Sequence, residues 1–162
     1  MIFKNKVILT FYPKIGVDNI KFGMKREEVE KVLKSEYKQD KTFQKESTDY
    51  YFENALTFSF EEDNTLSFVE VSSPPPVYLK INEIETWKIS GNKLVEKIKD
   101  FDEIDTDLFE YEYNPIFKNN IITFFELDEQ YDHIGNKKTP KWGAIGIGDQ
   151  RYYDGIKNIG RE

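Results

Sequence analysis

The stretch NIKFGMKREEVEKVL, residues Asn19–Leu33, decides how the chain is expected to fold. It indicates a short strand, a tight glycine turn and then an amphipathic helix. Val29, Val32 and Leu33 are spaced i, i+3 and i+4, so they fall on one face of that helix, while charged side chains occupy the other. We therefore predict a helix over residues 25–37 that packs its apolar face against a core.

Alternating and aromatic-rich runs predict β-strands through most of the remaining chain. The sequence holds 13 Phe, 10 Tyr and 2 Trp, and aromatic side chains favour pleated surfaces. The predicted strands are 6–12, 49–53, 55–61, 65–71, 78–81, 84–89, 108–113, 121–127 and 142–148. A second helix is predicted from Gly91 to about Phe101, with Ser90 as its N-cap. We expect exposed segments at 38–47 and 128–141, and no apolar helix after the last strand.

The prolines Pro74–Pro76 separate two similar halves, residues 1–73 and 77–162. An offset of 66 residues between the halves aligns Leu56-Thr57-Phe58 with Ile122-Thr123-Phe124. Because either half alone would bury little surface, we expect one domain over 1–162 with a shared core. The predicted fold class is α+β, with two helices packed on a mostly antiparallel sheet. Tandem α-β-β-β repeats would explain the offset, and two unrelated units that obey the same patterning are the alternative.

Composition excludes several kinds of chemistry. The chain of 162 residues has no cysteine and one histidine, His133, so disulfides, thiolate metal sites and cysteine nucleophiles are absent. The net charge is −7, and the sequence shows no basic face of the kind that nucleic-acid binding needs. No apolar run reaches the roughly 18 residues of a membrane span, and the first residues lack the pattern of a signal peptide. We expect a cytoplasmic protein without a cofactor and without enzymatic activity.

The residues Ile20-Lys21-Phe22-Gly23-Met24, followed by Glu27-Glu28-Val29 and Leu33, carry a resemblance. The segment resembles the opening of β-lactamase-inhibitor-protein-like α+β domains, and it is similar to a motif of bacterial immunity proteins that accompany polymorphic toxins. The sequence departs from that motif at Lys25, where a Ser or Thr usually caps the helix, and at Lys34, where a glycine usually follows it. The resemblance implies a duplicated fold and a non-enzymatic inhibitor of a bacterial toxin.

The strongest functional signal is a concentration of acids between residues 100 and 132. Eleven Asp and Glu stand there against one base, Lys118, giving a local net charge of −10. A patch of one sign with interleaved aromatics suits the capture of a basic protein, such as a nuclease toxin. The residues that we expect to contact the partner are Asp100, Asp102, Glu103, Asp105, Asp107, Phe109, Glu110, Tyr111, Glu112, Tyr113, Glu126, Asp128, Glu129 and Asp132.

Other interpretations of these residues stay open or fail on spacing. An EF-hand beginning at Asp100 would need glycine at its sixth position and glutamate at its twelfth, where the chain has Asp105 and Tyr111. The glycines of residues 143–148 do not have the spacing of a dinucleotide fingerprint, and they indicate close packing in a last strand. An accessory or scaffolding domain, whose acids only keep it solvated, and a carboxylate- or metal-dependent hydrolase are the alternative functions.

Overall fold

Fourteen strands and three α-helices form the described part of the chain. The computed structural model describes residues 6–72, 74–127, 130–134 and 137–159, and only the backbone within 130–141. The strands are β1 Val7–Tyr12, β2 Gly16–Val17, β3 Ile20–Lys21, β4 Phe43–Lys45, β5 Thr48–Tyr51, β6 Leu56–Phe60, β7 Leu66–Ser72, β8 Val77–Ile81, β9 Ile84–Glu85, β10 Ile116–Phe117, β11 Ile122–Phe125, β12 Gln130–Ile134, β13 Lys137–Lys141 and β14 Ala144–Gly148. The helices are α1 Arg26–Tyr37, α2 Gly91–Lys99 and α3 Gln150–Asn158, with a short 3-10 turn at Thr86–Lys88.

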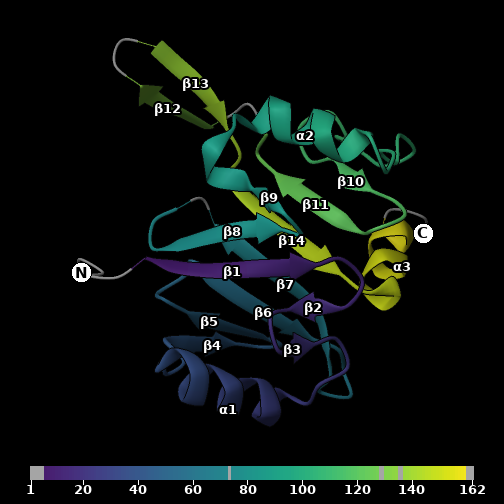
Figure 1. Cartoon of the computed structure of the whole chain (residues 1–162). Coiled ribbons are helices and arrows are strands. Elements are labelled where there is room, and N and C mark those ends of the chain that lie inside the picture. The colour runs from purple at the N-terminus through teal and green to yellow at the C-terminus, as the bar shows by residue number, and fades with distance from the viewer. Residues whose placement is uncertain (1–5, 73, 128–129, 135–136, 160–162) are drawn as a thin grey trace.

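The strands form two main sheets and a separate ribbon. One sheet has the order β3-β2-β1-β8-β9, and the larger one has the order β10-β11-β14-β7-β6-β5-β4. All pairs are antiparallel except β1 with β8, which lie side by side in the middle of the molecule (Figure 1). Strands β12 and β13 pair only with each other and project from it. The predicted α+β fold with a mostly antiparallel sheet is confirmed.

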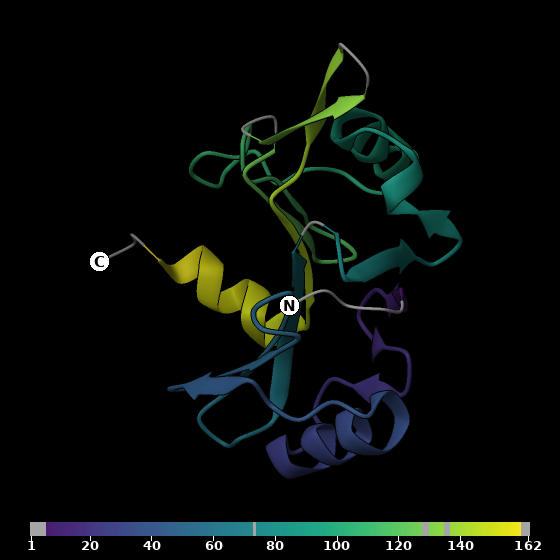
Figure 2. The same cartoon turned by 90° about the vertical axis from the view of Figure 1, so that its left-hand side faces the viewer.

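One main core lies between the two sheets and the first two helices. Val29 and Leu33 of α1 and Leu94 and Ile98 of α2 are fully buried in it, together with apolar side chains of β1, β6, β7, β8, β11 and β14. Helices α1 and α2 flank the same side of the large sheet at its two ends, whereas α3 lies on the other side (Figure 2). Tyr153 of α3 belongs to a second, smaller cluster with Ile116 and Ile121.

Local sequence explains how the first two helices begin and end. Helix α1 was expected over 25–37 and forms over Arg26–Tyr37, beginning without a side-chain cap at Lys25 and ending where Lys38 adopts a left-handed φ of 55°. The acids Glu27 and Glu28 in its first turn stabilise the helix, because they lie near the positive end of its dipole. Ser90 caps α2 as predicted, because its hydroxyl accepts a hydrogen bond from the backbone N–H of Lys93.

The two halves have the same strand order and the same local register. Reading outward from the central β7–β14 pair, the strands are β6 and β5 on one side, and β11 and β10 on the other. Tyr51 pairs with Leu56, and Phe117 pairs with Ile122, which is the same pairing 66 residues later. This is the arrangement that a tandem repeat would produce. Both halves contribute strands to both main sheets, so neither half is complete without the other.

The repeated pairing places an edge-to-face aromatic pair in each half. The two pairs differ at one position, because Tyr51 carries a hydroxyl that the equivalent Phe117 lacks. The Tyr51 ring meets Phe58 at 5.7 Å between centroids, and the equivalent pair is Phe117 with Phe124 at 6.1 Å. The Tyr51 hydroxyl is buried and has no hydrogen-bond partner among the described residues. Burial raises the pKa of this hydroxyl well above its usual range, so it stays neutral.

We expect Tyr51→Phe to raise the free energy of unfolding by about 1 kcal/mol, because it removes a buried polar group that gains no hydrogen bond. Equilibrium urea unfolding measures the change. Tyr37→Phe is the matched control, since the Tyr37 hydroxyl donates a hydrogen bond to Asp18 and its loss should destabilise the fold. An equal loss of stability in both variants would contradict this account of Tyr51.

Four local predictions differ from the structure. Residues 108–113 form turns rather than a strand, because Glu110 adopts a left-handed φ of 58° and its carbonyl accepts N–H groups from two residues that follow. Helix α2 ends at Lys99, so Phe101 leaves its apolar face and is half-exposed. Strand β4 forms within the expected loop 38–47, and the predicted strand 84–89 is mostly a 3-10 turn.

The largest difference is the third helix, which the sequence analysis did not expect. Asp149 caps it by accepting the backbone N–H of Tyr152. Tyr152, Tyr153 and Ile156 share one face at helical spacing after the N-cap Asp149, so a signal was present, but it is carried by only three apolar side chains in a short segment that contains Gly155. The glycines of β14 make room for it, since a Cβ on Gly148 would lie 2.5 Å from the Tyr152 ring. Close packing was the correct interpretation of these glycines.

Candidate functional site

The candidate site is built around the acidic loop, which we define as residues 100–115, between α2 and β10. The loop is held against β10 by an isolated bridge between Ile104 and Phe117 and by a hydrogen bond from the N–H of Asp105 to the carbonyl of Ile116. At its far end, the side chain of Asn114 accepts the backbone N–H of Glu126 at 3.0 Å. These contacts fix the loop at both ends on the second half of the large sheet.

Asp102 is the main anchor of the acidic loop. Its carboxylate accepts the backbone N–H groups of Glu103, Asn119 and Asn120 at 2.7, 3.1 and 2.8 Å. The side-chain amides of both asparagines also donate to it, at 3.0 and 2.9 Å. Burial pushes the pKa of Asp102 upward, but the combined hydrogen bonds from these groups outweigh burial and hold it below its usual range.

Asp105 joins the acidic loop to α3. Its side chain is buried, accepts the hydroxyl of Tyr153 and accepts the backbone N–H of Asp107 at 3.1 Å. Burial raises the pKa of Tyr153 well above its usual range, and the hydrogen bond to Asp105 adds to that effect. The acidic loop and the unexpected helix therefore support each other.

The structure sorts the predicted contact residues into distinct groups. Asp102 and Asp105 are buried and hydrogen-bonded within the fold, where their carboxylates hold the loop in place, and Asp105 also lines a cavity beside α3. The exposed ones are Asp100, Glu103, Asp107, Phe109, Glu110, Glu112, Tyr113 and Glu126, and Tyr111 is half-buried. Asp128 and Glu129 lie outside the described residues, and for Asp132 and His133 only the backbone, in β12, is described.

Aromatic side chains stand out among the exposed acids. Phe109 is 90% exposed, Tyr113 is 50% exposed and Phe101 is 47% exposed. Lys118, the single base of the acidic segment, pairs with Glu103 at 2.9 Å, which leaves the acids of residues 107–112 without that counter-charge. Large apolar rings exposed on a charged surface are typical of interaction sites rather than of inert solvated loops.

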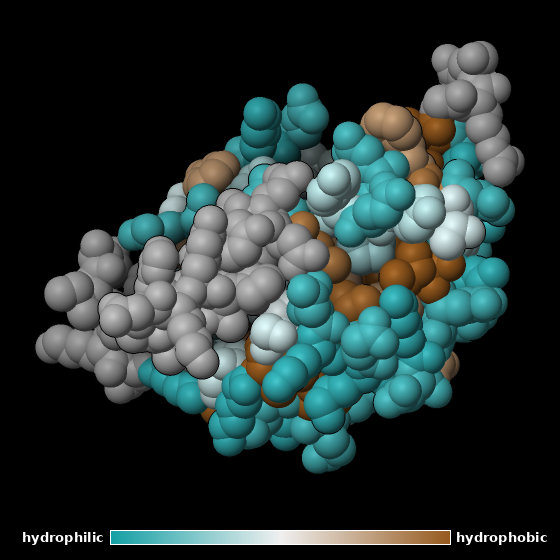
Figure 3. All heavy atoms as spheres, turned by 90° about the horizontal axis from the view of Figure 1, so that it is seen from above, coloured by the Kyte–Doolittle hydropathy of each residue, from teal (hydrophilic) through white to brown (hydrophobic). Residues whose placement is uncertain are grey.

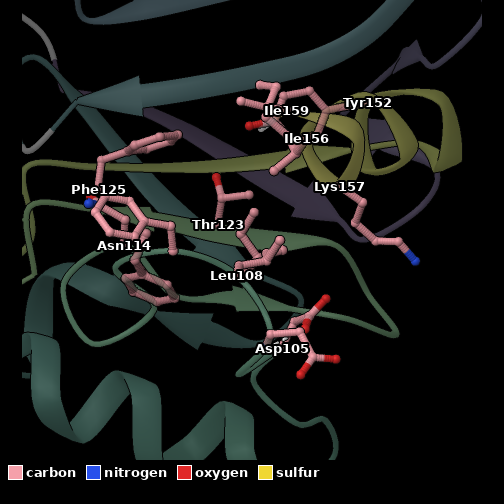
Figure 4. Close-up of a pocket in the computed structure, with 13 residues that line it drawn as sticks. Asp105, Leu108, Asn114, Thr123, Phe125, Tyr152, Ile156, Lys157 and Ile159 are labelled. Carbon is pink, nitrogen blue, oxygen red and sulfur yellow. Dashed lines mark hydrogen bonds between the residues drawn. The ribbon is translucent and has the colours of Figure 1, made fainter. Parts of the chain in front are cut away.

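A cavity of about 680 Å³ opens between the acidic loop and α3. Its lining includes Leu108 and Phe109 of the loop, Ile116 of β10 and Ile156 of α3. Thr123 of β11 lies between Leu108 and Ile156 (Figure 4). Seen from above, hydrophobic residues interrupt the largely hydrophilic surface of the molecule (Figure 3). Sequence reasoning missed the cavity because one of its walls is the helix that it did not expect.

Comparison of the chain with protein-family models, curated proteins and solved structures finds no match. The chemistry of the described residues therefore carries the functional argument. Among these residues, no group of three or more His, Asp or Glu side chains could hold a metal ion. No described helix is long and apolar enough to cross a membrane.

Proposed function

We propose that this chain is a non-enzymatic protein-binding inhibitor, an immunity-type protein that neutralises a basic bacterial toxin in the cytoplasm. The observation that carries the proposal is the set of exposed aromatic rings, Phe101, Phe109 and Tyr113, in a loop whose remaining exposed side chains are mainly acidic. The resemblance of residues 20–33 to immunity-protein motifs points the same way.

The mechanism follows from the two kinds of side chain. Acids of one sign speed the encounter with a positively charged partner, and aromatic side chains then supply desolvated contact area. A nuclease toxin must carry a basic surface to hold phosphates, so an acidic loop can occupy that surface and exclude the nucleic acid. Because Asp102 and Asp105 hold the loop in place, little ordering entropy is lost when the partner binds.

The triple variant Asp107→Lys, Glu110→Lys, Glu112→Lys is expected to lower the association rate constant with the toxin by tenfold or more at low salt. All three side chains are exposed, so the fold should remain intact. Surface plasmon resonance at about 20 mM and 300 mM salt measures the effect, which should shrink as salt screens the charges. The partner to test is the product of the gene beside this one, expressed alone for toxicity and together with this chain for rescue.

A control variant with the same net charge separates local from global electrostatics. Glu53→Lys, Glu62→Lys, Glu83→Lys changes three exposed acids that lie outside the acidic loop. Its association rate should fall much less than that of the loop variant. Equal rates for the loop variant and the wild type would remove the acidic loop from the mechanism, and a harmless neighbouring gene product that does not bind would favour the scaffolding function instead.

A further inference from the structure

We propose that the cavity between the acidic loop and α3 seats an aromatic side chain that carries its own hydrogen-bond donor, a tryptophan or a tyrosine, flanked by basic residues of the partner. The proposal rests on the proposed function, because it names the side chain by which the toxin would be anchored beside the acidic loop. The sequence of the acidic segment suggested charged and aromatic side chains on a surface, and the cavity adds a specific apolar receptor beside them.

The cavity is large enough for such a group, and it is partly rigid. At about 680 Å³ it falls within the range of sites that enclose small ligands. The ring of Tyr152, which lines it, stacks on Phe68 with centroids 4.0 Å apart and an interplanar angle of 10°. Gly146 permits this stack, since a Cβ there would lie 2.3 Å from the Phe68 ring. The wall therefore exists before any ligand arrives.

The floor of the cavity contains a polar group that the fold leaves unpaired. Thr123 is only 1% exposed and lines the cavity, and its Oγ1 has no hydrogen-bond partner among the described residues. The Tyr152 hydroxyl lies near it but without the geometry of a hydrogen bond. Figure 4 shows Thr123 in the midst of the apolar lining. A buried hydroxyl of this kind can donate or accept a hydrogen bond, and the N–H of a tryptophan or the O–H of a tyrosine would supply a donor to its oxygen on an otherwise apolar body.

The charges around the cavity select the residues that flank the anchor. Asp107 is exposed and lines the cavity, and Glu110 and Glu112 lie in the same loop. The lining also includes one lysine, Lys157, whose ammonium group stands 4.5 Å from the centroid of the Tyr153 ring and is partly engaged there. The surroundings are therefore mainly acidic, and basic residues on either side of the aromatic anchor would meet complementary charge.

Synthetic tripeptides test the proposal without the partner. The probes are N-acetylated, C-amidated Lys-Trp-Lys, Lys-Phe-Lys, Lys-Ala-Lys and Glu-Trp-Glu, titrated into the isotope-labelled full chain and followed by NMR. Lys-Trp-Lys should shift the methyl signals of Thr123, Ile156 and Leu108, and it should bind at least about tenfold more tightly than Lys-Ala-Lys or Glu-Trp-Glu. Thr123→Val, which keeps the side-chain shape, should weaken Lys-Trp-Lys about fivefold and leave Lys-Phe-Lys unchanged.

Each outcome decides between the cavity and the surface. Equal binding of Lys-Trp-Lys and Lys-Ala-Lys, or shifts only outside the cavity lining, would overturn the proposal and leave a purely electrostatic surface. An equal effect of Thr123→Val on the Trp and Phe peptides would overturn the role of the hydroxyl. The peptide series on the wild type does not depend on the folding of a variant. Failure of the proposed function would show instead in the toxin experiment, with peptide binding retained.

Discussion

Asp49→Asn is expected to lower the free energy of unfolding by about 3–5 kcal/mol. Asp49 is 1% exposed, and its Oδ1 lies 2.5 Å from Nη2 of Arg26, whose Nε also donates to it at 3.0 Å. Lys41 approaches the other carboxylate oxygen at 3.1 Å. The neutral amide would leave two largely buried cations without their counter-charge.

Equilibrium urea unfolding at pH 7 measures this loss. Asp40→Asn is the matched control, because Asp40 is 85% exposed, its distance to Lys34 is 3.7 Å, and exposed pairs of this kind contribute little. The double variant Arg26→Met, Asp49→Leu should recover part of the stability, since it removes the charge together with its partner. A loss below about 1 kcal/mol for Asp49→Asn would contradict the importance of this ion-pair cluster.

Asp102→Asn is expected to lower the free energy of unfolding by about 2–4 kcal/mol and to loosen the acidic loop. The asparagine would present an NH₂ group to donors that now converge on a carboxylate, so several N–H groups of residues 103, 119 and 120 would lose their acceptor. Asp107→Asn is the control, because that side chain is exposed. Hydrogen exchange of residues 103–120 should become faster in Asp102→Asn only.

The wild type and Asp102→Asn should differ in how the free energy of unfolding depends on pH. The folded state holds the pKa of Asp102 below its usual value of about 3.9. The charged form therefore stabilises the fold at pH values above about 4, and this contribution is lost as the pH falls through the lowered pKa. Thermal unfolding from pH 7 to pH 2.5 should show the gap between wild type and Asp102→Asn closing below pH 4. A gap that stays constant would exclude this linkage.

Sequence patterns predicted the elements whose signal is local. The helix over 25–37 and the strands near residues 49–71 formed within about two residues of their expected limits, because each carries its own periodicity. The turns of 108–113 depend instead on contacts made after folding, and the short helix α3, although Asp149 caps it, also packs through such contacts. Tyr152 is placed by a stack on Phe68, and the loop is placed by a backbone bridge to β10 and by hydrogen bonds from residues 119 and 120 to Asp102. Such contacts join residues far apart in sequence, so periodicity does not report them.

The candidate site could be located from sequence, but its members could not be assigned roles. All the acids of residues 100–112 count equally in a charge sum, whereas the structure separates Asp102, with partners 17 and 18 residues away, from the exposed Asp107. The cavity was beyond sequence reasoning, because it needs the positions of α3 and the loop at once. For the anchoring role of Asp102, the sequence offered one signal, the paired asparagines at 119 and 120, which supply hydrogen-bond donors next to a strand.

The central place of β7 has a consequence for how the protein is made. Its neighbour β6 precedes it in the chain, but its other neighbour, β14, ends 76 residues after β7 ends, at Gly148 as against Ser72. At ordinary rates of synthesis, the ribosome needs roughly 4–15 s to add that length. During this interval a strand rich in buried apolar residues has an unpaired edge, which is the feature that promotes strand addition between nascent chains. The binding of chaperones to the nascent chain should therefore be greatest while the second half is being translated.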